Sequence, residues 1–379
     1  MLIFTLPSWY KSKKYPENSI FIFEQMKALK KFNNDVVVLS VQPISIKSQK
    51  IADKSIKIVD DNGIITYYTE INTFMPSKFR RIYVFQFKKA LAKLLKKAIN
   101  DFGKPDVLYA HFTYAAGISA VKLKTDIPIV VEEHYSGLMD EIDDTLRYYL
   151  RKTIENSEKF ICVSNGLKES IEQKVGIYEN VDVISNMINP CFRFFPREKK
   201  KEFTFFSMGS LIPRKGFLLL IEAFSEEFKN SSNVILKIAG QGDQKEKIID
   251  FIKKNNMEER ITILGQLNRL QTLNYYINCD CFVLASEAET YGLVYREAMA
   301  VGRPIISTKH GGFGKNWNEK IGKLIDVGNK DQLKMALRYV YENYKEYDLN
   351  EISNIALSEC SADSVAKNII QVLKIAKDK

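Results

Sequence analysis

The 379-residue sequence has few of the residues that bind metals or form disulfides. It contains three histidines and five cysteines. The cysteines are odd in number and lack the spacing of ligand motifs, since even Cys279 and Cys281 have no histidine beside them. This pattern argues against a disulfide scaffold or a cysteine-rich zinc module. It predicts a reduced protein of the cytoplasm.

Long apolar segments are also missing. No apolar run approaches the roughly 20 residues of a membrane-spanning helix. Met1 leads directly into an apolar stretch without the basic start of a secretory signal. We therefore expect a soluble or peripheral protein. The formal net charge of +10 predicts an anionic partner, which leaves open a nucleotide, a phospholipid surface or a nucleic acid.

Apolar runs alternate with helical patterns along the chain and predict an α/β protein with two domains. Near-continuous apolar runs are typical of buried strands in parallel sheets. They occur at 2–6, 36–41, 107–111, 129–133, 160–163 and 181–184, and then at 203–208, 234–239, 261–264, 281–284 and 305–306. We predict a first domain at 1–190, a linker at 191–201 and a second domain at 202–355. A C-terminal helix at 356–379 is expected to cross back to the first domain.

The segment 77–104 is strongly basic, with Asp101 as its one acidic residue. A helical projection places Leu91, Leu94, Leu95 and Ala98 on one side and Lys88, Lys89, Lys93, Lys96 and Lys97 on the other. The simpler interpretation is a surface helix whose apolar side packs on a sheet. The second, compatible interpretation adds an anionic membrane against the basic side.

The segment 209–216, Gly-Ser-Leu-Ile-Pro-Arg-Lys-Gly, lies between a predicted strand and a predicted helix at 217–228. Backbone N–H groups and the helix dipole favour an anion at such a helix start. Arg214 and Lys215 would add charge-assisted hydrogen bonds. The segment lacks the Walker pattern, so we predict a phosphate site of another type. The alternative is a plain turn with solvated basic side chains.

Two carboxylates frame the segment 286–312, which follows the predicted strand at 281–284. We expect Glu289 in a loop and Glu297 near the start of a helix that begins after Gly292. Such a loop and helix start would suit a nucleoside diphosphate. Glu297 could accept hydrogen bonds from ribose hydroxyls, and Glu289 would face the group that the diphosphate carries. Alternatively, both are acids favoured by the dipole of the helix start.

Two of the three histidines, His111 and His134, end predicted strands. Ligand sites of parallel α/β sheets form at the carboxyl ends of the strands. His134 is the stronger candidate because Tyr135, Ser136 and Gly137 open a loop after it. His111 could instead pack beneath the site.

The spacing of Glu289, seven residues and Glu297 resembles the signature of glycosyltransferase family 4. The segments 209–216 and Pro7-Ser8-Trp9-Tyr10 also resemble that family, as do His134 after its strand and Asn186 after Val-Ile-Ser. The resemblance covers nearly the whole chain. It implies a GT-B architecture, in which two Rossmann-like domains with parallel sheets face each other across a cleft. It also implies retaining transfer from a nucleotide sugar without a metal, and no Asp-x-Asp sequence is present to hold one.

The resemblance assigns roles by matched position. His134, Glu289, Lys215 and Arg214 would be the catalytic group, with His134 at the reacting sugar and Lys215 and Arg214 on the leaving diphosphate. The implied donor-binding residues are Gly209, Ser210, Arg214, Lys215, Leu267 (at the base), Tyr291, Gly292, Leu293 and Glu297. The first domain would hold the acceptor.

The leading hypothesis is transfer of a sugar from a UDP- or GDP-linked donor to a lipid-linked or surface polysaccharide, such as capsule or O-antigen, at the inner membrane face. Ser210 stands where the family commonly has Arg, and the segment 17–20 lacks the usual glycines. These departures leave two alternatives, a non-catalytic partner of another transferase and a sugar-nucleotide epimerase. Nucleic-acid binding is disfavoured because no recognition module is present.

Overall fold

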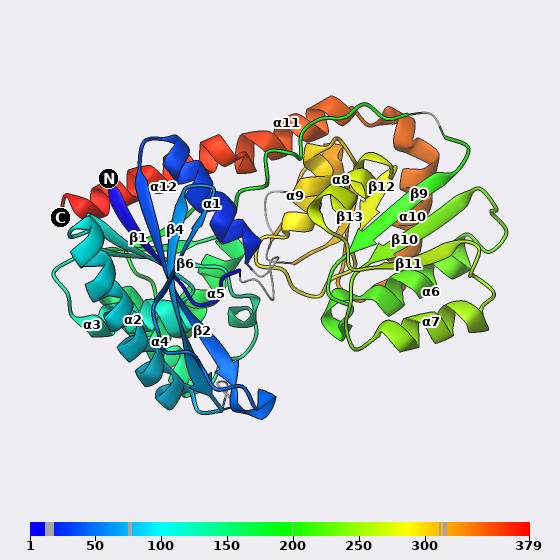
Figure 1. Cartoon of the computed structure of the whole chain (residues 1–379). Coiled ribbons are helices and arrows are strands. Elements are labelled where there is room, and N and C mark those ends of the chain that lie inside the picture. The colour runs from blue at the N-terminus through cyan, green and yellow to red at the C-terminus, as the bar shows by residue number, and fades with distance from the viewer. Residues whose placement is uncertain (12–18, 75–77, 199, 311, 314–316) are drawn as a thin grey trace. The chain divides into compact units, whose positions relative to one another are not determined.

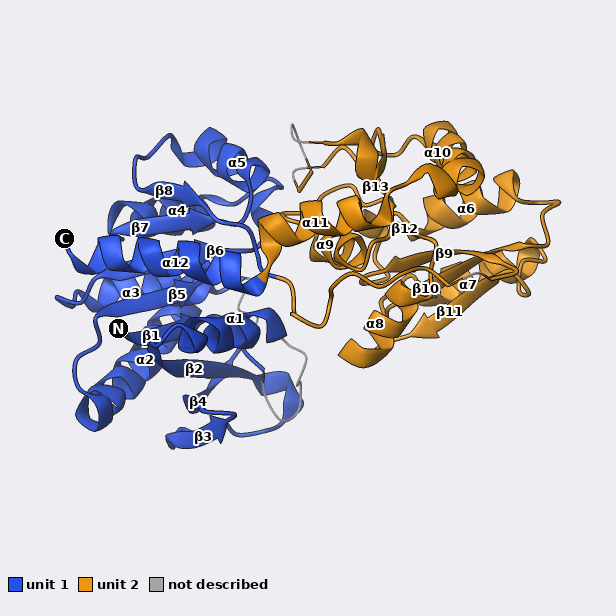
Figure 2. Ribbon diagram, turned by 90° about the horizontal axis from the view of Figure 1, so that it is seen from above, with its two compact units in different colours: residues 1–187, 362–379 blue, residues 188–361 orange. Residues whose placement is uncertain are grey.

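The computed structural model describes residues 1–11, 19–74, 78–198, 200–310, 312–313 and 317–379. It divides into two compact units, which Figure 2 shows in different colours. Unit 1 comprises residues 1–187 and 362–379, and unit 2 comprises residues 188–361. The predicted linker 191–201 therefore lies within unit 2. The predicted C-terminal helix is two helices, α11 (Leu349–Cys360) in unit 2 and α12 (Ala362–Lys377) in unit 1.

Unit 1 contains an eight-stranded sheet with the order β3-β4-β2-β1-β5-β6-β7-β8. Its strands are β1 (Leu2–Pro7), β2 (Asp35–Ser45), β3 (Lys57–Asp61), β4 (Ile64–Thr73), β5 (Val107–His111), β6 (Ile129–Glu133), β7 (Lys159–Cys162) and β8 (Val181–Val183). Only the edge strand β3 pairs antiparallel among these described strands. The strand order reverses between β1 and β5, and such a reversal is where ligands bind in open parallel sheets.

Helices cover both faces of this sheet (Figure 1). They are α1 (Ile20–Lys31), α2 (Arg80–Phe102), α3 (Ile118–Leu123), α4 (Asp144–Glu155), α5 (Asn165–Val175) and α12. α1 and α12 pack side by side, and α2, α3 and α4 lie on the opposite face. Met26 and Leu29 of α1 share one buried core with Ile369 and Leu373 of α12. The last helix of the chain is thus part of the first unit's core.

Unit 2 contains a six-stranded parallel sheet with the order β11-β10-β9-β12-β13-β14. Its strands are β9 (Phe203–Met208), β10 (Val234–Ala239), β11 (Ile261–Gly265), β12 (Cys281–Val283), β13 (Ile305–Thr308) and β14 (Gly322–Ile325). Its helices are α6 (Phe217–Glu227), α7 (Lys245–Lys254), α8 (Arg269–Ile277), α9 (Leu293–Ala300), α10 (Lys330–Asn343) and α11. This is the doubly wound Rossmann order, with its reversal between β9 and β12.

The basic segment forms α2 largely as the sequence predicts. Leu91, Leu94, Leu95 and Ala98 are buried, whereas Lys89, Lys93, Lys96 and Lys97 are exposed and Lys88 is half-buried. The exposed side continues towards the helix start with Ile82 and Phe85, which are 58% and 53% exposed. Among the described residues, no helix is both long and apolar enough to cross a membrane.

Candidate donor site and buried histidine chain

The predicted phosphate segment lies at the carboxyl end of β9. After Gly209, Pro213–Lys215 form one 3₁₀ turn, and Gly216 then starts α6 with a φ of +67°. A Cβ atom on Gly216 would lie 2.1 Å from the carbonyl oxygen of Ala285. Glycine is therefore required twice here, for the left-handed backbone and for the close approach to the chain that leaves β12.

The loop after β12 is hydrogen-bonded to this segment. The Glu287 N–H donates to the Arg214 carbonyl at 2.8 Å, and the Ser286 hydroxyl donates to the same oxygen at 3.2 Å. Next to these bonds, the Lys215 ammonium pairs with the Glu289 carboxylate. Two residues that the sequence predicts at one site, 74 positions apart, are therefore in contact.

Two helix starts belong to these segments. α6 and α9 both begin after a glycine with positive φ, Gly216 and Gly292, and neither has an acidic residue in its first turn. A glycine has no side chain to cap the first N–H groups, so those donors and the helix dipole are left for an anion. Tyr291, which is buried, and Leu293, which is half-buried, flank Gly292, so their backbone lies at this helix start.

Glu297 lies one turn further along α9 and is buried. Its carboxylate pairs with Arg269 at 2.8 Å and lies 3.4 Å from the Tyr276 hydroxyl. Arg269 opens α8, whose start is fixed by a capping box between Asn268 and Gln271. The half-buried Leu267 precedes this cap, so the proposed base contact and the proposed ribose ligand are linked through one helix start.

The remaining predicted donor residues differ in exposure. Ser210 is exposed and Arg214 is half-buried. Arg214 contributes its backbone carbonyl to the loop contact described above. Part of the predicted N-terminal loop, 12–18, lies outside the described residues, as do Gly311 and Lys315 of the segment after β13.

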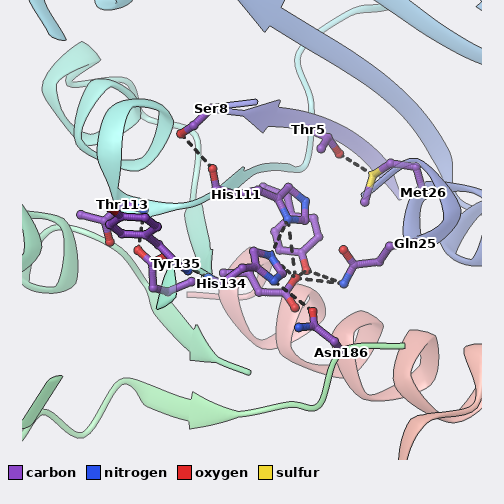
Figure 3. Close-up of polar contacts among 12 residues, drawn as sticks. Thr5, Ser8, Gln25, Met26, His111, Thr113, His134, Tyr135 and Asn186 are labelled. Carbon is purple, nitrogen blue, oxygen red and sulfur yellow. Dashed lines mark hydrogen bonds and ion pairs between the residues drawn. The ribbon is translucent and has the colours of Figure 1, made fainter. Parts of the chain in front are cut away.

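His111 and His134 form a pair in unit 1, at the ends of the neighbouring strands β5 and β6 (Figure 3). His111 Nδ1 lies 3.1 Å from His134 Nε2, and His134 Nδ1 lies 3.0 Å from Asn186 Oδ1. Strand alternation explains the grouping, because Tyr109 and His111 share one face of the sheet with Glu132 and His134. Burial lowers the pKa of His134 to about 3, so its imidazole is neutral.

Two glutamates end the apolar strand β6 and face opposite sides of the sheet. Glu132 Oε2 accepts hydrogen bonds from the Tyr109 hydroxyl and from Gln25 Nε2, and burial raises the pKa of its carboxyl to about 7. Glu133 accepts from the backbone N–H groups of Thr113, His134 and Tyr135 at 2.8 to 2.9 Å. Glu133 thereby fixes the backbone that follows β5 and the backbone that follows β6.

Nitrogen and oxygen atoms of His111, Glu132 and His134 lie within 4.8 Å of one another and are the one His, Cys, Asp and Glu grouping in the described chain that suits a metal ion. The two rings contact each other directly, however, and His111 Nδ1 and His134 Nε2 lie at a hydrogen-bond distance.

The sequence did not indicate several partners of the site residues. Arg269 and Gln25 have no sequence pattern that marks them. For Glu132 a signal was available, because two glutamates at the end of an apolar strand are unusual. Asn186 entered only through the family resemblance.

Comparison with protein families matches both parts of the chain. Residues 13–191 match the family described as Glycosyltransferase Family 4, and residues 190–358 match the family described as Glycosyl transferases group 1. The chain is a glycosyltransferase of the family 4 type. The predicted family membership and enzyme class are confirmed.

The relatives of this glycosyltransferase agree with the assignment. An uncharacterized glycosyltransferase of Methanocaldococcus jannaschii is 28% identical over 67% of this chain and 73% of its own. The N-acetylgalactosamine-N,N'-diacetylbacillosaminyl-diphospho-undecaprenol 4-alpha-N-acetylgalactosaminyltransferase of Campylobacter jejuni is 28% identical over 37% of each chain. Anabaena HepE, in complex with UDP and glucose, superposes with a TM-score of 0.74 at 18% identity, covering 98% of this chain and 99% of HepE. Together with the two largely parallel sheets, this likeness confirms the GT-B fold.

Proposed function

We propose that this glycosyltransferase moves a sugar, with retention of anomeric configuration, from a nucleotide-sugar donor to a lipid-linked or surface polysaccharide acceptor. The main observation in favour of a nucleotide-sugar donor is the Lys215–Glu289 pair beside the uncapped starts of α6 and α9. It supplies cationic and N–H groups for a diphosphate and a carboxylate for sugar hydroxyls. A structural relative that is in complex with UDP and glucose supports a nucleotide-sugar donor for this fold.

The proposed chemistry follows from charge. Breaking a sugar–phosphate bond requires stabilisation of the leaving diphosphate, and preorganised donors provide it without reorganisation during the reaction. Lys215 and Arg214, with the N–H groups of 292–294, take that role. Glu297 binds the ribose, Glu289 the donor sugar and Leu267 the base, while His134 contacts the reacting sugar. We propose that these groups make a divalent metal on the diphosphate unnecessary.

The first test uses mass spectrometry of products from a panel of UDP- and GDP-sugars with lipid-linked acceptors. Glu297→Ala should raise the Kd of the nucleotide at least tenfold, whereas His134→Gln should stop transfer and leave that Kd unchanged. Unchanged donor binding and turnover in Glu297→Ala would remove the ribose assignment. NMR of the product's anomeric proton tests retention, and excess EDTA tests metal independence.

The same panel separates the alternatives. An epimerase would form a new sugar nucleotide without any acceptor, and a non-catalytic partner would bind no donor in calorimetry. The family match favours the transferase. The Campylobacter jejuni relative, named for a diphospho-undecaprenol acceptor, supports a lipid-linked acceptor for this chain.

We further propose that α2 docks this enzyme on the anionic inner face of the membrane. Its exposed side joins Ile82 and Phe85 to Lys89, Lys93 and Lys96. Apolar groups would enter the interface, and each Lys adds about 1 kcal/mol near anionic lipid. The exposed lysines of α2 thus place part of the chain's positive charge on one surface of unit 1.

Vesicle pelleting tests the docking surface. The double variant Lys89→Glu/Lys93→Glu should lose binding to vesicles that contain anionic lipid, and salt should weaken wild-type binding. Lys253→Glu/Lys254→Glu on α7 makes the same charge change on exposed residues of unit 2 and serves as the matched control. Equal pelleting by both variants, or by anionic and neutral vesicles, would refute the proposal.

A further inference from the structure

A continuous chain of buried polar side chains runs from Asn186 through His134 and His111 to Glu132. Figure 3 shows the two histidines and Asn186 in this arrangement. Both ring nitrogens of His134 are engaged, one with Asn186 and the other with His111. The rings are inclined by only 15°, with centroids 5.4 Å apart. That separation is the N···N distance plus about one ring radius at each end, so the rings meet edge to edge. The hydrogen between them therefore points along the ring planes at a lone pair.

The direction of this hydrogen-bond chain can be deduced. If His134 donates from Nδ1 to Asn186 Oδ1, then its Nε2 accepts from His111 Nδ1–H, and His111 Nε2 is a bare acceptor. The reverse direction would leave an N–H on His111 Nε2, which is buried and lacks a partner among the described residues. A buried orphan donor is rarer and more costly than a buried orphan acceptor.

Glu132 stabilises the hydrogen between the two rings, whichever ring carries it. Its Oε2 lies 3.8 Å from His111 Nδ1 and 3.9 Å from His134 Nε2, so it attracts the hydrogen that lies between the two rings. Gln25 and Tyr109 hold this carboxylate from the other side. The backbone of His134 is fixed in addition by Glu133.

We propose that His111, Glu132 and Asn186 are positioning residues that hold His134 as a neutral imidazole with its hydrogen on Nδ1. In this state Nδ1 already carries a proton and Nε2 already accepts a hydrogen bond. Both ring nitrogens are then occupied within the protein. His134 therefore meets the sugar as a fixed neutral ring and not as a general acid or base. The inference rests on the proposed role of His134 at the reacting sugar. Among the described residues, the titratable and polar groups that face this ring pair are Gln25 from α1, Tyr109 from β5, Glu132 from β6 and Asn186 after β8.

The chain's three histidines make the tautomers directly measurable. Two-bond ¹H–¹⁵N spectra of protein labelled at histidine, assigned with His310→Gln and His111→Gln, report which nitrogen carries the hydrogen. His310 is an internal reference of the opposite type, because its Nδ1 accepts from the Gly312 N–H and its hydrogen must lie on Nε2. We expect Nδ1–H for His111 and His134, without titration between pH 5.5 and 8. An Nε2–H form of His134, or a midpoint within that range, would overturn the proposal.

Glu132→Gln tests the positioning role in catalysis. At metal sites, loss of the partner that orients a histidine costs about 10- to 100-fold. We expect a loss of that order in kcat here, while the nucleotide Kd stays unchanged. Glu158→Gln is the matched control, since Glu158 caps the start of the same strand through the Ile129 N–H at 2.6 Å. Equal losses in both variants would indicate a merely structural effect and refute the role of Glu132.

Three further outcomes are decisive. Equimolar zinc in the purified protein, together with loss of the His111 Nδ1 hydrogen, would replace the hydrogen-bond chain by a metal site. If His134→Gln remains active while the tautomers are as described, the catalytic role of His134 is refuted and the hydrogen-bond chain is retained. If His134→Gln is inactive but His134 titrates near neutral pH, the catalytic role is retained and the hydrogen-bond chain is refuted.

Discussion

Substitution of Gly216 by alanine should damage both the stability of unit 2 and nucleotide binding. An L-residue with a φ of +67° costs about 1–2 kcal/mol. The new Cβ would also lie 2.1 Å from the Ala285 carbonyl oxygen and 2.8 Å from its carbon, so backbone must move. Overpacking of this kind adds about 1–3 kcal/mol, which gives a total of about 2–5 kcal/mol. The movement would separate the two segments that Arg214 and Glu287 join, and we expect the nucleotide Kd to rise at least tenfold.

Gly328 provides the control for the backbone part of this effect. Its φ of +74° is nearly the same, but a Cβ there would meet no atom within 4 Å. Gly328→Ala should therefore cost only the 1–2 kcal/mol of the left-handed backbone. Thermal unfolding measures both, at about 2–4 °C per kcal/mol for a domain of this size, and calorimetry with nucleotide measures Kd. Equal Tm losses, or an unchanged Kd in Gly216→Ala, would refute the argument from close approach.

Three further outcomes are expected. Glu289→Gln should tighten binding of free nucleoside diphosphate and slow turnover of the complete nucleotide sugar, as calorimetry and product assays can show. Leu373→Ala should cost unit 1 about 2–5 kcal/mol, whereas the exposed Ile375→Ala on the same helix should cost little, in urea unfolding. Unfolding free energy should fall as pH decreases from about 6.5 towards 3, by about 1.4 kcal/mol per pH unit for each buried histidine that the unfolded chain protonates and the folded chain does not. These histidines are His111, His134 and His310. The raised carboxyl pKa of Glu132 has the opposite effect. Between pH 4.5 and about 7 the folded chain binds a proton on Glu132 that the unfolded chain does not, and this offsets the contribution of one histidine.

Most strands were predictable because burial on both faces produces continuous apolar runs, as at 107–111 and 203–208. The antiparallel strand β3 was missed because its residues are mostly exposed and form no apolar run. It is a strand because it pairs with β4, which follows it closely in the chain. The break between α11 and α12 was also missed. Ser361 separates two helical patterns that continue without a proline or glycine, so only tertiary packing decides where one helix ends.

The candidate donor site was predictable in its parts, because glycines, basic residues and paired acids leave local signals. What the sequence could not provide was the pairing. Arg269 has no pattern that links it to Glu297, 28 positions away, and nothing local predicts that Glu132 approaches both histidines. These contacts follow from strand order, since β5 and β6 are neighbours in the sheet and the residues at their ends alternate in register.

We expect the Lys215–Glu289 pair to let one loop distinguish a nucleotide sugar from a bare nucleotide. The side chains of Lys215 and Glu289 are only 17% and 12% exposed, so the two charges offset each other's desolvation before any donor arrives. A diphosphate that takes Lys215 leaves the Glu289 carboxylate without its cation in a poorly hydrated place. Hydroxyl donors of the attached sugar would then satisfy that carboxylate, whereas a nucleotide without a sugar would not. Binding of the complete donor should therefore be favoured over binding of the bare nucleotide, because a buried carboxylate left without partners costs more than one that is hydrogen-bonded.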